Sequence, residues 1–246
     1  MHYRSAVALF SLLSALLLIP LAIIPTSEPT WRQQVAAVRR GESDTIHITA
    51  ERVTDAQLQD IAGLATLRVL KLEQGSVSAA GLSVLAELPQ LDTLWLRNSR
   101  VGNRAIREIV KNQRLAHLNL PQAEFGDTGL ELLTTLPHLQ QLRFSSPHVT
   151  ARGLTKLSQA RSLRQLHLFE VPITAAVLES IAQLDELESL YIDRPYADPT
   201  DIEAAFMAFY EARPDVHVHV DQRHHDLDPH WHEHRAVHSH PHPHPH

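Results

Sequence analysis

Apolar residues return at a fixed interval along most of this chain. Leucine or isoleucine occupies every twenty-fourth position from Ile46 to Leu190, without an insertion or deletion. A second apolar column follows two residues later, and a third, from Leu67 to Leu187, lies three residues upstream. Because a fixed period of roughly 20 to 50 residues is typical of repeat arrays, the pattern predicts stacked repeats rather than one globular core.

Within each repeat the apolar spacing changes from two residues to three. Leu70 and Leu72 flank Lys71, which predicts a short strand with its polar side chains facing outward. Leu82 and Leu85 begin a three-residue spacing, which predicts a short helix or 3₁₀ turn. One such unit cannot bury its apolar edge alone, so we expect parallel strands on an inner wall and helices outside. Each predicted helix follows a residue suited to an N-cap, in the column Thr54, Ser78, Gly102, Gly126, Thr150 and Thr174.

Two segments carry a resemblance to a known family. Residues 52–67 read RVTDAQLQDIAGLATL and residues 76–91 read SVSAAGLSVLAELPQL. Both resemble the VTDxGLxxLxxLxxL form of leucine-rich repeats in bacterial proteins and in the repeats that follow F-boxes. The resemblance covers about Thr45 to Asp221. It implies an α/β solenoid, a horseshoe with about seven to eight parallel inner strands and short outer helices, and a role in binding rather than catalysis.

The chain departs from that family at two columns. Leucine-rich repeats often carry asparagine after the strand, and its amide bonds the backbone along the stack. Backbone groups in these turns must therefore find other partners. Asn112 and Ala160 also replace leucine in the last helix column, so we expect the third and fifth repeats to pack less tightly. The residues in the asparagine column are Glu51, Gly75, Ser99, Ala123, Pro147 and Val171.

The ends of the chain differ from the repeats. Residues 1–5 form a short stub, and residues 6–24 are uncharged and long enough to cross a bilayer as one helix. We expect a single-pass transmembrane anchor, or an uncleaved signal, since no A-x-A cleavage pattern follows. Short N-terminal stubs usually stay cytoplasmic, so the repeat domain is expected on the extracytoplasmic side. Residues 25–44 are predicted to be a linker and an N-terminal cap helix, and residues 45–222 the repeat domain with a C-terminal cap.

Composition narrows the function classes. The chain has no cysteine, which excludes disulfides, thiolate zinc sites and thiol nucleophiles. Its formal net charge of −6, with no basic field, argues against nucleic acid as a partner. No nucleophile elbow, HExxH motif or phosphate-binding glycine loop is present. We therefore expect a protein that is not an enzyme and whose repeats require no cofactor.

The outward strand residues predict a binding surface, which we call the concave face. Its central column varies while the core columns do not, and it mixes aromatic with basic side chains, as protein-recognition patches do. The alternative is that these are scattered surface aromatics without a function. Trp95, Phe169 and Tyr191 are the strongest candidates. The full set predicted to bind a protein or peptide is Lys71, Trp95, Arg97, Asn119, Arg143, His167, Phe169 and Tyr191.

The last segment, residues 223–246, is rich in histidine and proline. Proline prevents regular helices and ladders, so we expect a disordered tail. Imidazoles at this density bind Zn²⁺, Ni²⁺ or Cu²⁺, which makes divalent-metal capture or sensing the alternative function. The tail could also be a low-complexity extension whose metal affinity is unused. The candidate ligands are His224, His225, His230, His232, His234, His238, His240, His242, His244 and His246.

Overall fold

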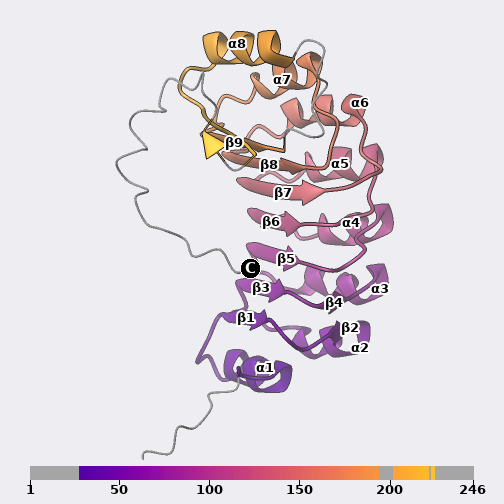
Figure 1. The fold of residues 1–246 in the computed structure, drawn as a ribbon. Helices are drawn as coiled ribbons and strands as arrows, with labels where there is room; N and C mark the ends of the chain where they lie inside the picture. The colour runs from indigo at the N-terminus through magenta and orange to yellow at the C-terminus, as the bar shows by residue number, and fades with distance from the viewer. Residues whose placement is uncertain (1–27, 194–201, 222, 225–246) are drawn as a thin grey trace, which may run out of the picture.

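Short strands stand side by side in chain order along one wall of the molecule, and the helices line the opposite side (Figure 1). The computed structural model describes residues 28–193, 202–221 and 223–224. Within these ranges the main sheet has nine strands, all parallel except for the last pair. The parallel strands, in spatial order, are β1 (Thr45–Ile48), β3 (Val69–Leu72), β5 (Thr93–Leu96), β6 (His117–Leu120), β7 (Gln141–Ser145), β8 (Gln165–Phe169), β9 (Ser189–Ile192) and β10 (His217–Val220).

The register of this sheet follows the sequence repeat. Ile46 pairs with Leu70, Leu70 with Leu94, and so on through Leu166 with Leu190. Both apolar residues of each strand are buried, so the inward side chains form one continuous core. The predicted α/β solenoid with seven to eight parallel strands is confirmed for the described residues, which contain eight. A ninth strand, β11 (Arg223–His224), pairs antiparallel with β10 and includes the first two residues of the segment expected to be a disordered tail.

Short helices cover the outer side of the sheet. Each begins directly after one of the six predicted N-cap residues. The Thr54, Thr150 and Thr174 hydroxyls accept a hydrogen bond from the backbone three residues on, which satisfies one open N–H of each helix. The helices are α2 (Asp55–Leu58), α3 (Ala79–Leu82), α4 (Asn103–Ile109), α5 (Asp127–Leu133), α6 (Ala151–Leu154) and α7 (Ala175–Ile181), with 3₁₀ turns η1 (Gln59–Ile61), η2 (Ser83–Glu87) and η3 (Thr155–Gln159).

The turns without asparagine satisfy their backbone through neighbouring repeats. The Gly75 N–H donates to the Arg97 carbonyl at 3.2 Å, and the Ala123 N–H donates to the Ser145 carbonyl at 2.9 Å. Two short strands, β2 (Val53–Thr54) and β4 (Gly75–Ser76), add a second parallel ladder at these turns. At these two turns, the backbone N–H groups that lack an asparagine partner therefore donate to carbonyl groups of the adjacent repeat.

Asn112 does not loosen the third repeat in the way its sequence position suggested. Its buried amide donates to the carbonyls of Leu85 and Leu88 in the preceding repeat, at 2.9 Å each. These bonds add a second donor to two carbonyls at the end of η2, which also accept from the Leu88 and Leu91 N–H groups at 3.3 Å each. Asn112, the exception in the leucine column, thus links the third repeat to the second by hydrogen bonds.

Both ends of the array are covered within the described residues. Helix α1 (Trp31–Arg39) buries Trp31 against the first repeat, and the Gln34 amide exchanges two 2.7 Å hydrogen bonds with the backbone of His47 on the edge strand β1. At the other end, α8 (Ile202–Ala212) buries Phe206 and Phe209. Among the described helices none is long and apolar enough to cross a membrane, and the predicted anchor over residues 6–24 lies outside them.

A side chain at the start of some helices bridges to the next repeat. We define the bridging position as the residue directly after each N-cap. The Asp55 carboxylate accepts hydrogen bonds from the backbone N–H and the hydroxyl of Ser78, at 2.7 and 2.6 Å. Asp127 makes the same pair of bonds with Thr150, and the Asn103 side chain accepts from the Gly126 N–H at 2.9 Å. These bridges fasten the outer side of the solenoid.

Each bridge requires a glycine in the repeat that it reaches. A Cβ added at Gly81 would overlap the Asp55 carboxylate, and one added at Gly153 would overlap that of Asp127. Where the bridging position is alanine, the facing residue has a Cβ: Ala79 faces Ala105. The two positions, 26 residues apart, therefore change together along the chain, because a carboxylate and a Cβ cannot share the same space.

Candidate binding surface

The strand pairing brings the predicted binding residues together on one face. Lys71 stands opposite Trp95 in the ladder, Asn119 opposite Arg143, and His167 opposite Tyr191. Because strand side chains alternate, these residues point away from the leucine core. Arg97 directly follows β5, and Phe169 ends β8. The structure thus places all eight predicted residues on the concave face, while their binding of a partner stays a prediction.

Cations lie over aromatic rings at two points of this face. The Lys71 ammonium is 3.7 Å from the centre of the Trp95 ring, and the Arg143 guanidinium carbon is 4.6 Å from the centre of the Phe169 ring. Such contacts are worth about 0.5 to 1 kcal/mol at exposed sites. They hold long, otherwise mobile side chains in place, which lowers the entropy that a partner would lose on binding them.

A stack of rings continues the face toward its C-terminal end. The ring centres of His167 and Tyr191 are 4.1 Å apart, and those of Tyr191 and His219 are 4.3 Å apart with the planes 9° from parallel. The stack crosses three adjacent strands, β8, β9 and β10, at matched register positions. It forms a rigid aromatic platform at one end of the face.

The middle of the face lacks a counter-charge. Burial, together with the nearby Arg97 charge, lowers the pKa of Arg143. Burial, with Arg143 as the second cause, lowers the pKa of His167 to about 4, so His167 is neutral at physiological pH. Among the described residues no carboxylate pairs with Arg143, whereas Arg97 pairs with Glu73 at 3.1 Å. Asn119 Oδ1 and Arg143 Nε are buried without a hydrogen-bond partner in the described part of the chain.

Two histidines of β10 join this face although the sequence did not single them out as candidates. His217 and His219 continue the outward column after Ser189 and Tyr191. Their signal was the alternation with valine that predicted the strand, but a longer connection separates β10 from β9 and breaks the 24-residue register. A search for equivalent positions at that period therefore could not reach them.

A small cavity of about 230 Å³ adjoins the aromatic stack, lined in part by Tyr191, Asp193 and Asp221. Burial raises the pKa of Asp193, with the neighbouring Asp221 and Glu170 as further causes. A carboxyl group in this position holds a proton more readily than an ordinary aspartate. The cavity therefore adds an acidic corner to the C-terminal end of the concave face.

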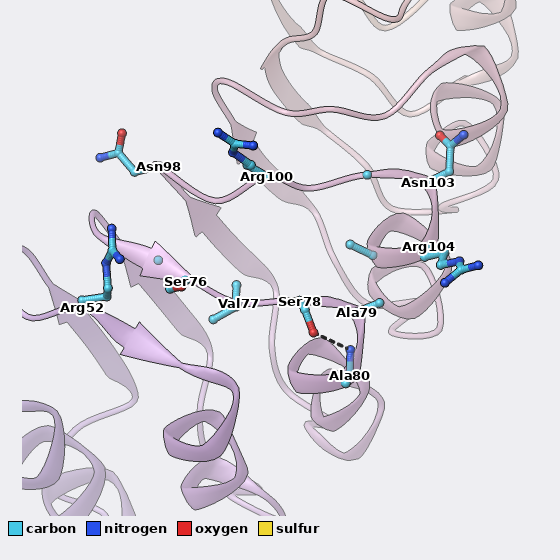
Figure 2. Close-up of a pocket in the computed structure, with 13 residues that line it drawn as sticks. Arg52, Ser76, Val77, Ser78, Ala79, Ala80, Asn98, Arg100, Asn103 and Arg104 are labelled. Atoms are coloured by element: carbon cyan, nitrogen blue, oxygen red, sulfur yellow. Dashed lines mark hydrogen bonds between the residues drawn. The ribbon is translucent and has the colours of Figure 1, made fainter.

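A larger open cavity of about 980 Å³ lies elsewhere, at the junction where the bridging position is Ala79 (Figure 2). Arg52, Arg100 and Arg104 reach its lining from three separate segments, and Arg100 lies 3.5 Å from Glu124. Because Ala79 has no polar atom to offer, the neighbouring turn at Gly102 receives no bridge of the Asp55 kind.

Of the ten candidate metal ligands in the tail, only the first lies within the residues that the structure describes. His224 belongs to β11, while the other nine, from His225 to His246, lie outside the described residues. Within the described part of the chain, no group of three or more histidine, aspartate or glutamate side chains is arranged to hold a metal ion. The tail hypothesis is thus not tested by the placement of its own residues.

Comparison with known proteins identifies the fold. No protein-family model matches the sequence, and no curated protein matches it significantly. Among solved structures, the chain is similar to internalin C2 from Listeria monocytogenes, with a TM-score of 0.57 and 20% identity over 80% of this chain and 78% of that one. At this identity the likeness shows the fold alone, which is that of a leucine-rich-repeat solenoid.

Two complexes of receptors match more weakly. They are the plant peptide hormone receptor RGFR1 in complex with RGF2, with a TM-score of 0.35 and 15% identity, and PEPR1–AtPEP1, with a TM-score of 0.27 and 12% identity. The matches cover 65% and 61% of this chain but only 29% and 31% of those chains. The chain therefore spans less than a third of either receptor.

Proposed function

We propose that this leucine-rich-repeat solenoid is a binding scaffold that holds an acidic, extended peptide segment of a partner protein on its concave face. One observation carries the proposal: aromatic and cationic side chains, already packed against one another, run across the strands from Lys71 to the Tyr191–His219 stack. Aromatic residues and arginine are the types that contribute most to protein interfaces.

The dimensions of the sheet suit such a segment. Eight parallel strands at ~4.8 Å spacing span roughly 34 Å, which is the length of about ten residues of extended chain. A segment that crosses the strands would meet the Lys71–Trp95 pair at one end and the aromatic platform at the other. Its apolar side chains would bury against rings that are already ordered, so little side-chain entropy is lost.

The acidic character of the partner follows from the charges on the face. Arg143 is half-buried beside Arg97 and has no carboxylate of its own among the described residues. Burial, and secondly the Arg97 charge, lower the pKa of Arg143, and a carboxylate from outside would offset both by placing an opposite charge beside the guanidinium. It would also form a charge-assisted hydrogen bond, which is stronger than a neutral one. We place an aspartate or glutamate of the partner over β7.

The membrane location belongs to the same proposal. The apolar segment 6–24 is the anchor, and the repeat domain stands on the extracytoplasmic side, where the concave face meets a secreted or surface-exposed partner. Resistance of the full chain to carbonate extraction, with the repeats accessible to protease added outside sealed cells or spheroplasts, is the expected result. Release by carbonate, or protection of the repeats, would contradict this location.

The binding test uses the full chain and displayed random peptides of twelve residues. We expect the selected peptides to be enriched in aspartate and glutamate. Their dissociation constants should rise at least tenfold for Tyr191→Ala and for Arg143→Gln, measured by fluorescence anisotropy. Arg152→Ala, on the outer helix α6, serves as the matched control and should change affinity less than twofold.

Thermal unfolding of each variant without peptide shows whether the fold is retained. The proposal is wrong if selected peptides carry no acidic bias, or if folded Tyr191→Ala and Arg143→Gln bind as tightly as Arg152→Ala does. Selection at two salt concentrations sharpens the result, because a carboxylate–arginine contact on an exposed face weakens as salt rises.

The second candidate function is capture of Zn²⁺, Ni²⁺ or Cu²⁺ by the histidine-rich tail. One observation favours it: the β10–β11 pairing sets His224, the first tail histidine, opposite His219 on the sheet. The test is calorimetric titration of the full chain against a variant with glutamine at all ten candidate tail histidines. We expect several ions per chain for the native sequence. Equal stoichiometry in both proteins would exclude the tail.

A further inference from the structure

We propose that His217 and His219 form a binding site for a divalent transition-metal ion at the C-terminal end of the concave face. The proposal extends the second candidate function, but the site belongs to the folded sheet rather than to the tail. It therefore stands or falls independently of the ten candidate histidines of the tail.

The geometry of the two imidazoles is the primary observation. His217 Nε2 and His219 Nε2 face each other at 2.6 Å, and the ring planes meet at 78°. Both residues are half-buried on the same strand, two positions apart, so their side chains leave the sheet on the same side. Two lone-pair nitrogens that converge from perpendicular rings occupy the positions of two ligands around one ion.

The separation of the nitrogens is close to what an ion requires. A zinc–nitrogen bond is ~2.0 to 2.1 Å, so two imidazoles at a tetrahedral angle hold their nitrogens ~3.3 Å apart. Without metal, one Nε2–H donates to the other Nε2 across the observed 2.6 Å. When an ion binds, the Nε2–H proton moves to Nδ1 of the same ring, the ion takes its place, and the nitrogens move apart by about 0.7 Å, which small side-chain rotations accommodate.

The surroundings hold one of the two ligands in place. The His219 ring lies flat on Tyr191, with ring centres 4.3 Å apart, and Tyr191 in turn packs on His167. This stack restricts the rotation of His219 and so lowers the entropy lost when it binds an ion. Ring orientation set by such neighbours is a general property of histidine metal ligands.

The two imidazoles fill only part of the coordination sphere. Water completes the coordination of the ion, as it does where a protein supplies fewer ligands than the metal requires. Imidazole nitrogen as the ligand type favours Cu²⁺ over Ni²⁺ and Zn²⁺ in affinity.

The experiment removes the tail histidines without removing the tail. In a full-length chain with glutamine at His224, His225, His230, His232, His234, His238, His240, His242, His244 and His246, we expect calorimetry to show one Cu²⁺, Ni²⁺ or Zn²⁺ per chain. In this background, His217→Gln and His219→Gln should each weaken binding at least tenfold. His138→Gln, an exposed histidine in the turn before β7, is the control and should change affinity less than twofold.

A second readout identifies the ligands directly. Titration with Zn²⁺ should move the imidazole ¹⁵N resonances of His217 and His219 and leave that of His138 in place. Unchanged affinity in the folded His217→Gln/His219→Gln double variant would overturn the proposal, and the close pair would then be a hydrogen bond only. Peptide affinity, measured without metal, separates this result from the concave-face proposal.

Discussion

Two junctions on the outer side of the solenoid occupy equivalent places in the repeat and have opposite chemistry. Between the first and second repeats, the Asp55 carboxylate caps Ser78 and packs against Gly81. Between the second and third, Ala79 faces Ala105, no carboxylate reaches Gly102, and the surface opens into the cavity lined by three arginines. The comparison teaches that neighbouring repeats can be joined either by a polar bridge or by apolar packing, and that only the second arrangement leaves space.

The largest expected effect comes from Gly81→Ala. The new Cβ overlaps the Asp55 carboxylate, and over-packing of this kind costs about 1 to 3 kcal/mol. The free energy of unfolding, measured with urea, should fall by that amount. In an Asp55→Ala background the same substitution should cost less but still destabilise, because the carboxylate is gone while the Cα of residue 55 remains 2.9 Å from the new Cβ. Equal effects in both backgrounds would contradict the steric conflict.

Asp55→Ala alone should cost about 1 to 2 kcal/mol of unfolding free energy, since it removes two hydrogen bonds that cap the start of α3. Asp127→Ala provides a second measurement at an equivalent bridge and should give a similar loss. Amide hydrogen exchange at Ser78 and Thr150 should rise selectively in the respective variants. A loss below ~0.3 kcal/mol at both sites would show that water replaces the bridges at no cost.

The junction between the second and third repeats can be given a polar bridge like the one between the first and second. Ala79→Asp with Ala105→Gly should behave as a coupled pair: each single substitution destabilises, and the double variant recovers about 1 kcal/mol relative to the sum of the two. The double-mutant cycle measures that coupling from urea unfolding. Additive effects would mean that position 79 does not reach Gly102 in the way that Asp55 reaches Ser78.

A dependence on pH separates the concave face from the outer junctions. The pKa of His167 in the folded state, about 4, is below that of the unfolded chain, so the unfolded state takes up a proton first as pH falls. Stability should therefore decrease between about pH 6.5 and pH 4. His167→Gln should flatten this part of the pH profile, whereas Asp55→Ala should leave it in place. An unchanged profile in His167→Gln would assign the effect to other groups.

Most of the fold could be predicted from the sequence, because each leucine column marks a position that is buried in every repeat. The N-cap column was equally readable, since few residue types satisfy the open N–H groups of a helix start. Asn112 was misjudged because its value depends on carbonyls of the preceding repeat, which no local pattern reveals. The pairing of Asp55 with Gly81 was present in the sequence at a spacing of 26, but its meaning required the contact.

The concave face was only partly predictable. Alternation along the strands identified which side chains point outward, and so placed Trp95 and Tyr191 correctly on one surface. It could not show that His219 stacks on Tyr191, or that His217 and His219 meet at their nitrogens, because these contacts depend on how the longer connection returns β10 to the sheet. It also could not show that no carboxylate of the described residues pairs with Arg143, since pairing depends on how far side chains reach across strands.

The two hydrogen bonds between the Gln34 amide and the backbone of His47 bear on whether another molecule can extend the sheet. A parallel sheet grown by addition of like units has a free edge at each end, and β1 of one molecule could receive β10 of another without closing a ring. Gln34 occupies the N–H and carbonyl of His47 at the first edge, and β11 covers part of the last. Two short elements outside the repeat pattern thus cover edge positions at which a second molecule could add to the sheet.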